Sequence, residues 1–213
     1  MAKLVSSFKN MALSLTCIAL VAAGALAGVY MLTMAPIEAA MKAKQEAAIM
    51  QVLPEVEGLQ VADAEDVNGI TLYKAYVGEE WVGTAVEATT EGNVNMPFGG
   101  TFRLMVGFDN VGNVVNYVVL EQAETPGLGA LMTTWFKNAD KPGQNILGKT
   151  PATTEFSVSK DGGDIDAITA STITSRAFLE VVVKAYNAIA QQPMPIEATS
   201  GATQLTTEEG GLQ

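Results

Sequence analysis

The feature that most constrains this chain is a long apolar segment near its N-terminus. From Asn10 to Ile37 there is no charged residue, and residues 11–34 read MALSLTCIALVAAGALAGVYMLTM. As a helix, this segment would extend about 36 Å, enough to cross a hydrocarbon core of about 30 Å with some tilt. The segment therefore predicts a transmembrane helix.

The charges around this segment predict its orientation. Residues 1–10 carry only Lys3 and Lys9, and the positive-inside rule places such a segment in the cytoplasm. A single-pass protein of the inner (cytoplasmic) membrane would then hold its main domain on the periplasmic, or extracytoplasmic, side. The alternative is a cleaved signal peptide, because residues 25–27 (ALA) resemble a cleavage site. The apolar run continues well beyond Ala27, which favours a retained anchor.

Composition excludes several classes of chemistry. The chain has no histidine and one cysteine, Cys17, which lies within the apolar segment. Histidine-dependent catalytic triads, histidine-ligated zinc or haem, iron–sulfur clusters and an internal disulfide are therefore excluded. Redox or group-transfer chemistry would come mostly from an organic cofactor, and we expect neither a catalytic residue nor a resident metal. After position 34, 10 basic and 23 acidic residues give a net charge of −13, which argues against nucleic-acid binding.

The part after the anchor divides into a helical and polar region, a mixed domain and a tail. Residues 35–69 predict a juxtamembrane helix over residues 38–53, ended by Pro54, and then a polar, acidic connector. Residues 70–190 predict one domain. Residues 191–213 are polar with Pro, Gly and Thr, and predict a flexible tail.

The first half of the domain has the composition of a β-sheet. Four runs predict strands: Ile70–Val77, Trp81–Ala88, Thr101–Phe108 and Asn113–Leu120. The links between the first two and between the last two are short, at residues 78–80 and 109–112. Links of this length predict two antiparallel hairpins.

The second half of the domain has a different pattern. A Gly/Pro loop is followed by a predicted short helix through Phe136 and by another predicted strand over residues 155–160, which turns at residues 161–163. Residues 176–190 predict an amphipathic helix. Because strands precede helices without βαβ alternation, the chain predicts an α+β fold with an antiparallel sheet and flanking helices.

The entry to the last helix is rich in hydroxyl side chains. Five of the seven residues from Thr169 to Ser175 are Ser or Thr. Such residues cap the free N–H groups at a helix start, and the same N–H groups, with the helix dipole, also bind phosphate. The residues alone leave two interpretations open, a capping turn with additional hydroxyls and an anion site.

Two motifs in this half resemble family signatures. Residues 166–178, DAITASTITSRAF, resemble the flavinylation motif of the FMN-binding domain family, and residues 124–129, ETPGLG, resemble the second signature of that family. With the N-terminal anchor, the chain resembles the G subunits of the Rnf ion-translocating electron-transport complex, which are related to the C subunit of the sodium-pumping NADH:quinone oxidoreductase. The resemblance runs from the anchor to about Ala190.

The resemblance implies a covalent FMN, joined through its phosphate to the hydroxyl of Thr172. A separate flavin transferase would form this phosphoester from FAD outside the cytoplasm, and Asp166 and Thr169 would belong to the sequence that the transferase recognises. The cofactor-binding residues implied around the attachment site are Thr169, Ala170, Ser171, Thr172, Ile173 and Thr174. Those implied in the earlier loop, where glycine allows the backbone to approach the flavin, are Glu124, Thr125, Gly127, Leu128 and Gly129.

The roles of several further residues have two interpretations each. Glu124 either matches the loop acid of the family or anchors a turn, and Lys160 either faces the phosphate or is a solvated lysine beside a turn. Residues 98–100 (FGG) resemble a glycine loop near the flavin. Trp81 and Trp135 either stack on the flavin ring or pack in the core.

The attachment site has competing hydroxyls. Ser171 stands where the family usually has Ala, directly beside Thr172. Residues 197–203 (EATSGAT) reproduce the core of the motif around Thr203, but they begin with Glu and are followed by no helical pattern. We therefore favour Thr172.

The leading interpretation is an electron-carrier subunit with a covalent FMN, which alone does not catalyse a full reaction. The resemblance implies other membrane subunits as partners, including a second flavin-bearing subunit, in a complex that couples ferredoxin/NAD electron transfer to sodium or proton translocation. The alternatives are a stand-alone extracytoplasmic flavin reductase and a non-redox module that binds an anion or another ligand.

Overall fold

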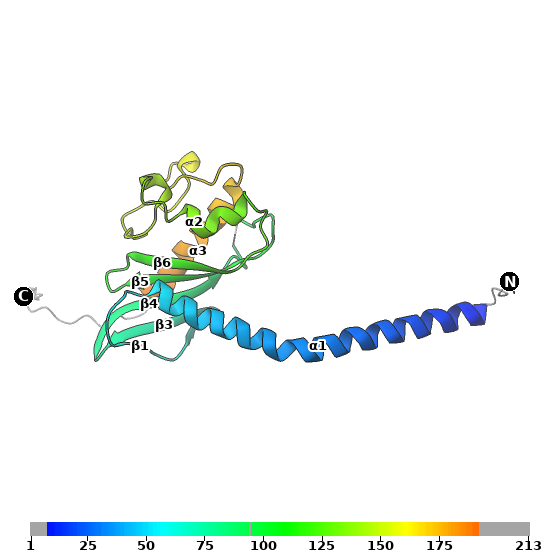
Figure 1. Ribbon diagram of the computed structural model, residues 1–213. Coiled ribbons are helices and arrows are strands. Elements are labelled where there is room, and N and C mark those ends of the chain that lie inside the picture. The colour runs from blue at the N-terminus through cyan, green and yellow to red at the C-terminus, as the bar shows by residue number, and fades with distance from the viewer. Residues whose placement is uncertain (1–7, 94, 192–213) are drawn as a thin grey trace, which may run out of the picture.

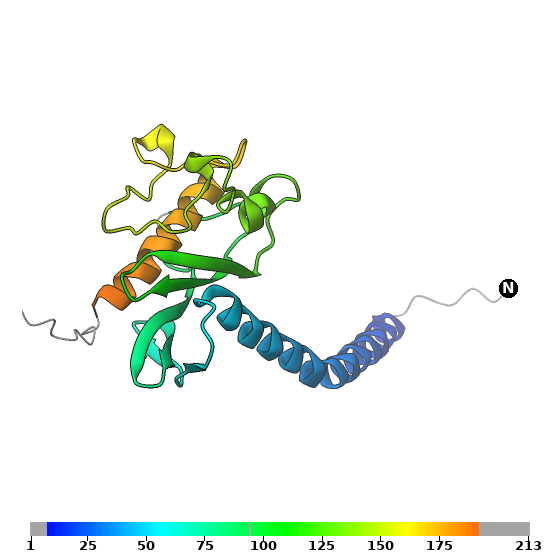
Figure 2. The ribbon, with the colours of Figure 1, turned by 60° about the vertical axis from the view of Figure 1, so that its left-hand side comes forward.

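A single long helix leads into the folded domain. The computed structural model describes residues 8–93 and 95–191, and its first element is α1, Phe8–Val52, which projects far from the rest of the chain (Figure 1). The predicted transmembrane and juxtamembrane segments form one continuous helix. Pro36 lies inside it, and Figure 2 shows that the helix axis changes direction part-way along. Proline removes one backbone hydrogen bond and bends a helix without ending it when both flanks are strongly helical.

The N-terminal part of α1 has no protein neighbours among the described residues. It is long and apolar enough to cross a membrane, and none of the side chains in its most apolar stretch is buried within the chain. Leu15 and Leu20, for example, are 70% and 68% exposed. Apolar surface on this scale needs a lipid or protein partner, and this fits a membrane anchor.

The sheet contains the four predicted strands and two more. Its strands are β1 (Leu59–Val61), β2 (Glu65–Val67), β3 (Ile70–Val77), β4 (Glu80–Thr89), β5 (Arg103–Asp109) and β6 (Val114–Glu121). All pairs are antiparallel, in the order β1-β3-β4-β5-β6, with β2 also pairing with β3. The hairpins β3–β4 and β5–β6 confirm the prediction. The prediction of a connector without strands before Ile70 is wrong, because β1 and β2 lie within it. These two strands are too short to show alternation in the sequence.

Helices and turns make up the second half of the domain. They are the 3₁₀ turn η1 (Gly129–Leu131), α2 (Met132–Trp135), η2 (Pro142–Gln144), η3 (Ser159–Asp161) and the long helix α3 (Thr172–Ala190). The short helix near Phe136 is confirmed, and α3 begins earlier than its apolar pattern indicated. The strand predicted over residues 155–160 is wrong. That segment makes one isolated bridge, between Val158 and Ile165, and then turns through η3, because no neighbouring strand is available to extend the pairing.

Both faces of the sheet are covered. On one face α3 packs over Val106 and Phe108 of β5, and Phe178 of α3 stacks on Phe136 with ring centroids 4.4 Å apart. On the other face the end of α1 packs on the neighbouring side chains of the same strands, including Met105. Figure 1 shows α1 and α3 on opposite sides of the sheet. An antiparallel sheet covered on both faces is buried throughout its centre, and β5 is accordingly buried from Leu104 to Phe108.

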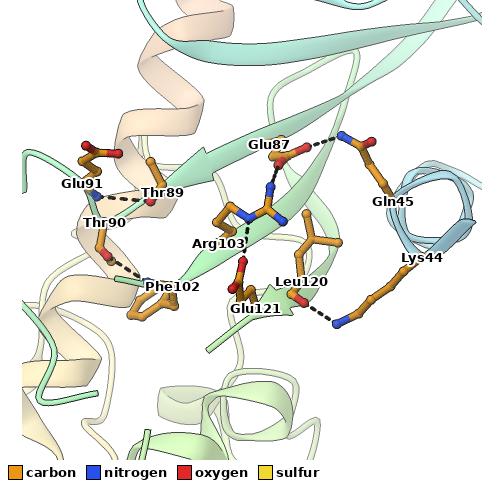
Figure 3. A network of polar contacts seen from close by, with 10 residues as sticks. All are labelled: Lys44, Gln45, Glu87, Thr89, Thr90, Glu91, Phe102, Arg103, Leu120 and Glu121. Atoms are coloured by element: carbon orange, nitrogen blue, oxygen red, sulfur yellow. Dashed lines mark hydrogen bonds and ion pairs between the residues drawn. The ribbon is translucent and has the colours of Figure 1, made fainter. Parts of the chain in front are cut away.

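The contact between α1 and the sheet is close and specific. A Cβ added to Gly107 would lie 1.8 Å from the carbonyl oxygen of Val52, so only glycine allows this approach. Polar groups surround the contact (Figure 3): Lys44 donates to the carbonyl of Leu120, and Gln45 donates to Glu87, which also pairs with Arg103 at 2.9 Å. The anchor helix is therefore fixed to the sheet by packing and by directed hydrogen bonds.

This packing predicts the effect of two adjacent substitutions in α1. Ile49 is 8% exposed and packs on the sheet, whereas Met50 is 54% exposed. We expect Ile49→Ala to lower the free energy of unfolding by about 2–5 kcal/mol, as for other large-to-small core changes. Met50→Ala should change it by less than about 0.5 kcal/mol. Urea unfolding of the full chain in mild detergent, followed by tryptophan fluorescence, measures both, and equal effects would contradict the docking of α1 on the sheet.

Candidate functional site

Thr172, the predicted attachment residue, is the first residue of α3. Ser171 precedes it as the N-cap and makes no side-chain capping hydrogen bond. The residue before that, Ala170, has a φ of 59°, a left-handed conformation that disfavours large side chains. The chain thus turns sharply into α3 and leaves the first N–H groups of the helix without a capping side chain.

The hydroxyls of the motif divide into structural and accessible groups. Thr174 and Ser175 are buried, and Ser175 Oγ both accepts a hydrogen bond from the N–H of Ile168 and donates one to the carbonyl of Ser171. Thr172 and Ser171 are half-buried, and Thr169 is exposed. The Thr174 side chain therefore lies in the core, whereas Thr172 is accessible at the start of the helix.

The turn η3 lies against Thr172. Lys160 in η3 donates from Nζ to Thr172 Oγ1 at 3.4 Å. Arg176, one turn further along α3, makes a bidentate pair with Asp161, with distances of 2.6 and 2.7 Å. The hydrogen bonds from Arg176 hold the pKa of the Asp161 carboxyl below its ordinary value. Of the two interpretations of Lys160, its position beside the hydroxyl favours the one that faces the attachment site.

The start of the motif is tied to α2. Trp135 Nε1 donates to the carbonyl oxygen of Asp166 at 2.9 Å, and Ser159 Oγ donates to Asp166 Oδ1 at 2.7 Å. Trp135 is half-buried and packs against the core, as one of its two interpretations predicted. Because α2 directly follows the ETPGLG loop and η1, this hydrogen bond connects the two motifs that are far apart in sequence.

Glu124 organises the earlier loop. It is 7% exposed, and its Oε1 accepts a hydrogen bond from the N–H of Gly99 at 2.9 Å. A Cβ at Gly129 would lie 2.1 Å from Glu124 Oε2, so Gly129 allows the carboxylate to sit inside the loop. Glu124 thus acts as the turn anchor that one of its two interpretations predicted. The same contact holds residues 98–100 beside the ETPGLG loop. The Phe98 side chain is 85% exposed there.

The rest of the loop is shaped by turns. The carbonyl of Thr125 accepts hydrogen bonds from the N–H groups of Leu128 and Ala130, and Gly127 has a φ of 76°, which favours glycine. Leu128 is 39% exposed. The loop therefore presents backbone and the side chains of Thr125, Pro126 and Leu128 to the outside.

Trp81 lies away from this cluster. Trp81 is the second residue of β4, at the end of the sheet opposite to Arg103 and Glu121, and donates to Thr84. Because the ETPGLG loop follows Glu121, Trp81 is remote from it. Thr203 and the second motif-like run lie outside the described residues.

The comparisons with known proteins fit these boundaries. The model of the FMN-binding domain family matches residues 98–187, and that of the RnfG N-terminal region matches residues 1–52. The G subunit of the ion-translocating oxidoreductase complex of Methanosarcina acetivorans is 31% identical over 182 residues, which cover 82% of this chain and 90% of the relative. Those of Haemophilus influenzae (strain PittEE) and Escherichia coli (strain K12) are 32% and 33% identical, over 71% and 76% of this chain and 75% and 81% of the relatives.

This chain belongs to the family of these G subunits. The N-terminal match of the family ends at residue 52, where α1 ends on the sheet, and the FMN-binding match begins at Phe98, next to the loop that Glu124 anchors. The two matched regions thus cover the anchor helix and the FMN-binding domain, and β1–β4 lie between them.

The residues that hold η3 in place were not predicted from the sequence. Asp161, Ser159 and Arg176 were not singled out as site residues, because their contacts join residues up to 15 positions apart through a non-helical turn. The only signal in the sequence is the DGG run at 161–163, which predicts a turn but not its partner.

The role of Glu124 leads to a stability prediction. Glu124→Ala should lower the free energy of unfolding by roughly 1–3 kcal/mol, because it leaves the N–H of Gly99 without its acceptor. Glu124→Gln keeps an acceptor oxygen and should lose much less. Glu121→Ala, at a side chain that is 65% exposed, is the matched control and should lose less than about 1 kcal/mol. Urea unfolding and amide hydrogen exchange at Gly99 measure these effects, and protection at Gly99 that persists in Glu124→Ala would refute the assignment.

Proposed function

We propose that this protein carries FMN as a phosphoester on Thr172 and serves as a membrane-anchored electron carrier in an Rnf-type complex. The observation that carries the proposal is the accessible Thr172 hydroxyl at the uncapped start of α3, with the Lys160 ammonium 3.4 Å away. The match to the FMN-binding domain family spans this residue. Hydroxyl, free helix N–H groups and a cation form a donor set that suits a phosphate.

The attachment reaction transfers a flavin phosphate to the chain. A bond forms between Thr172 Oγ1 and the flavin-side phosphorus of FAD, the pyrophosphate P–O bond breaks, and AMP leaves. The proton of the hydroxyl passes to a base of a separate flavin transferase, whose divalent metal assists the transfer. Asp166 and Thr169, which are both exposed, are proposed as part of the sequence that the transferase recognises.

The chain's own residues hold and position the cofactor. FMN supplies the redox chemistry when it is attached, since no exterior side chain of this chain is suited to that role. The motif residues Ala170, Ser171 and Ile173 shape the turn around the ester. The loop of Thr125, Gly127, Leu128 and Gly129 is proposed to lie against the flavin, where glycine backbone permits close approach. A covalent tether keeps the carrier from dissociating outside the membrane.

The anchor sets the location of this carrier. In our proposal residues 1–10 face the cytoplasm, residues 11–34 cross the inner membrane, and the flavin domain at residues 70–190 lies on the extracytoplasmic side, joined by residues 35–69. Lys3 and Lys9 support this orientation. The relatives are named as subunits of an ion-translocating oxidoreductase complex, so we propose other membrane subunits as partners, one with its own flavin. The coupled ion is sodium or the proton.

The attachment site is tested by substitution. After co-expression with a flavin transferase, the wild-type chain should show flavin fluorescence on a denaturing gel, because the ester survives denaturation. Thr172→Ala should abolish it, whereas Thr203→Ala and Ser171→Ala should retain it, and peptide mass mapping should locate FMN on the peptide that contains Thr172. Fluorescence that persists in Thr172→Ala would refute this site, and a wild-type chain without any fluorescence would refute covalent attachment and favour an anion-binding module.

The role within a complex is tested by purification. When the tagged full chain is extracted from its native membrane in mild detergent, we expect other membrane subunits to co-elute, because most of the apolar surface of α1 is exposed. A variant whose apolar segment is replaced by an unrelated transmembrane helix is the control and should lose these partners. A monomeric wild-type protein that turns over a soluble acceptor would instead support a stand-alone flavin reductase.

A further inference from the structure

The turn that carries Lys160 is held against α3 from two sides. On one side Ser159 Oγ donates to both the carbonyl of Ile165 and the carboxylate of Asp166, at 2.9 and 2.7 Å. On the other side Asp161 receives two hydrogen bonds from the guanidinium of Arg176. The turn is therefore fastened to residues that precede and follow Thr172 in the chain.

The ends of this turn are equally constrained. Gly162 ends η3 with a φ of 93°, a conformation that favours glycine. A Cβ at Gly163 would lie 2.2 Å from both the carbonyl oxygen and the hydroxyl of Ser157, so the chain passes too close for any other residue. The backbone between Ser159 and Gly163 thus has little freedom, and it directs Lys160 toward the start of α3.

The environment of Lys160 differs from that of the other described lysines with assigned partners. Lys44, Lys137, Lys149 and Lys184 donate to backbone carbonyls, and Lys42 and Lys74 pair with carboxylates. Lys160 instead donates to a neutral hydroxyl. Two carboxylates are close to it in sequence, Asp161 in the same turn and Asp166 at the start of the motif. Those two carboxylates accept from Arg176 and Ser159. A cation directed at a hydroxyl suits an anion attached to that hydroxyl.

We propose that Lys160 is the cationic partner of the phosphate on Thr172, and that the ion pair between Asp161 and Arg176 positions it. This inference rests on the attachment proposed above. During ester formation Lys160 stabilises the negative charge on the phosphoryl oxygens as the bond to Thr172 Oγ1 forms and AMP leaves. Afterwards it neutralises the single negative charge of the phosphodiester, together with the N–H groups at the start of α3. Asp161 and Arg176 are positioning residues, because they act through Lys160.

The first experiment compares the rate of flavin attachment in four full-length proteins. Wild type, Lys160→Met, Lys160→Arg and Lys141→Met are incubated in detergent with purified flavin transferase, FAD and Mg²⁺, and in-gel fluorescence is followed with time. We expect Lys160→Met to slow attachment roughly tenfold or more, the size of one hydrogen bond to a charged group. Lys160→Arg should recover most of the rate, and Lys141→Met, which removes an exposed lysine of the same domain, should match wild type.

Thermal unfolding provides a second readout that does not depend on transferase or electron transfer. Before attachment, Lys160→Met should unfold at the wild-type temperature, because Lys160 is exposed. After attachment, the wild type should gain thermal stability, and the gain in Lys160→Met should be about 2–4 °C smaller. A purely structural role for Lys160 would instead lower the unfolding temperature before attachment.

The positioning role is tested by combining substitutions. Asp161→Asn lies outside the flavinylation motif and should slow attachment in the same direction as Lys160→Met. The double variant Lys160→Met/Asp161→Asn should be no slower than Lys160→Met alone, because Asp161 acts only through Lys160. Additive losses would overturn the positioning role.

The outcomes separate this inference from the proposed function. If the wild type accepts FMN on Thr172 but Lys160→Met keeps the wild-type rate and the wild-type gain in unfolding temperature, the role of Lys160 is overturned while attachment stands. If the wild type accepts no covalent flavin, attachment itself fails, and the role of Lys160 fails with it.

Discussion

The structure depends on a sheet that is packed on both faces. The carbonyl of Val52 lies so close to Gly107 that no side chain fits between α1 and β5, and the opposite face of the same strand is covered by α3. The membrane helix and the helix that begins at Thr172 are thereby fixed to one rigid layer. The position of Thr172 relative to the end of the anchor helix is set by this sheet and not by a flexible linker. For the electron carrier that we propose this matters, because the reach of a tethered cofactor depends on how firmly its support is held.

The candidate site is assembled from three segments that the sequence separates widely. Glu124 joins the loop at Gly99 to the ETPGLG loop, and Trp135 joins the helix after that loop to the carbonyl of Asp166. Each connection is a single hydrogen bond between partners at least 25 residues apart. Buried or half-buried polar groups of this kind need their partners, so the contacts define one arrangement of the loops. The ETPGLG loop and the motif around Thr172 are in this way parts of one unit.

The sequence predicted the elements with strong local signals. The four longer strands were recognised by their β-forming residues and short links, and the last helix by its apolar stripe. Elements without such signals were missed: β1 and β2 are three residues long, and residues 155–160 have strand-like composition but no strand to pair with. At the site, recognition of the motif indicated Thr172, but the burial of Thr174 and the ion pair of Asp161 with Arg176 follow from packing that no spacing shows.

The sequence by itself determined which chemistry this protein can perform. It has an uncharged segment that can cross a membrane, no histidine, one cysteine within that segment, and two motifs of a flavin-binding family. These are properties of residue type and order, so they need no fold. Only the tertiary structure decided which groups meet: that α1 continues through Pro36 onto the sheet, that Glu124 turns inward to Gly99, and that Lys160 faces Thr172. Such contacts depend on how distant segments pack, and packing is not encoded in any local pattern of the chain.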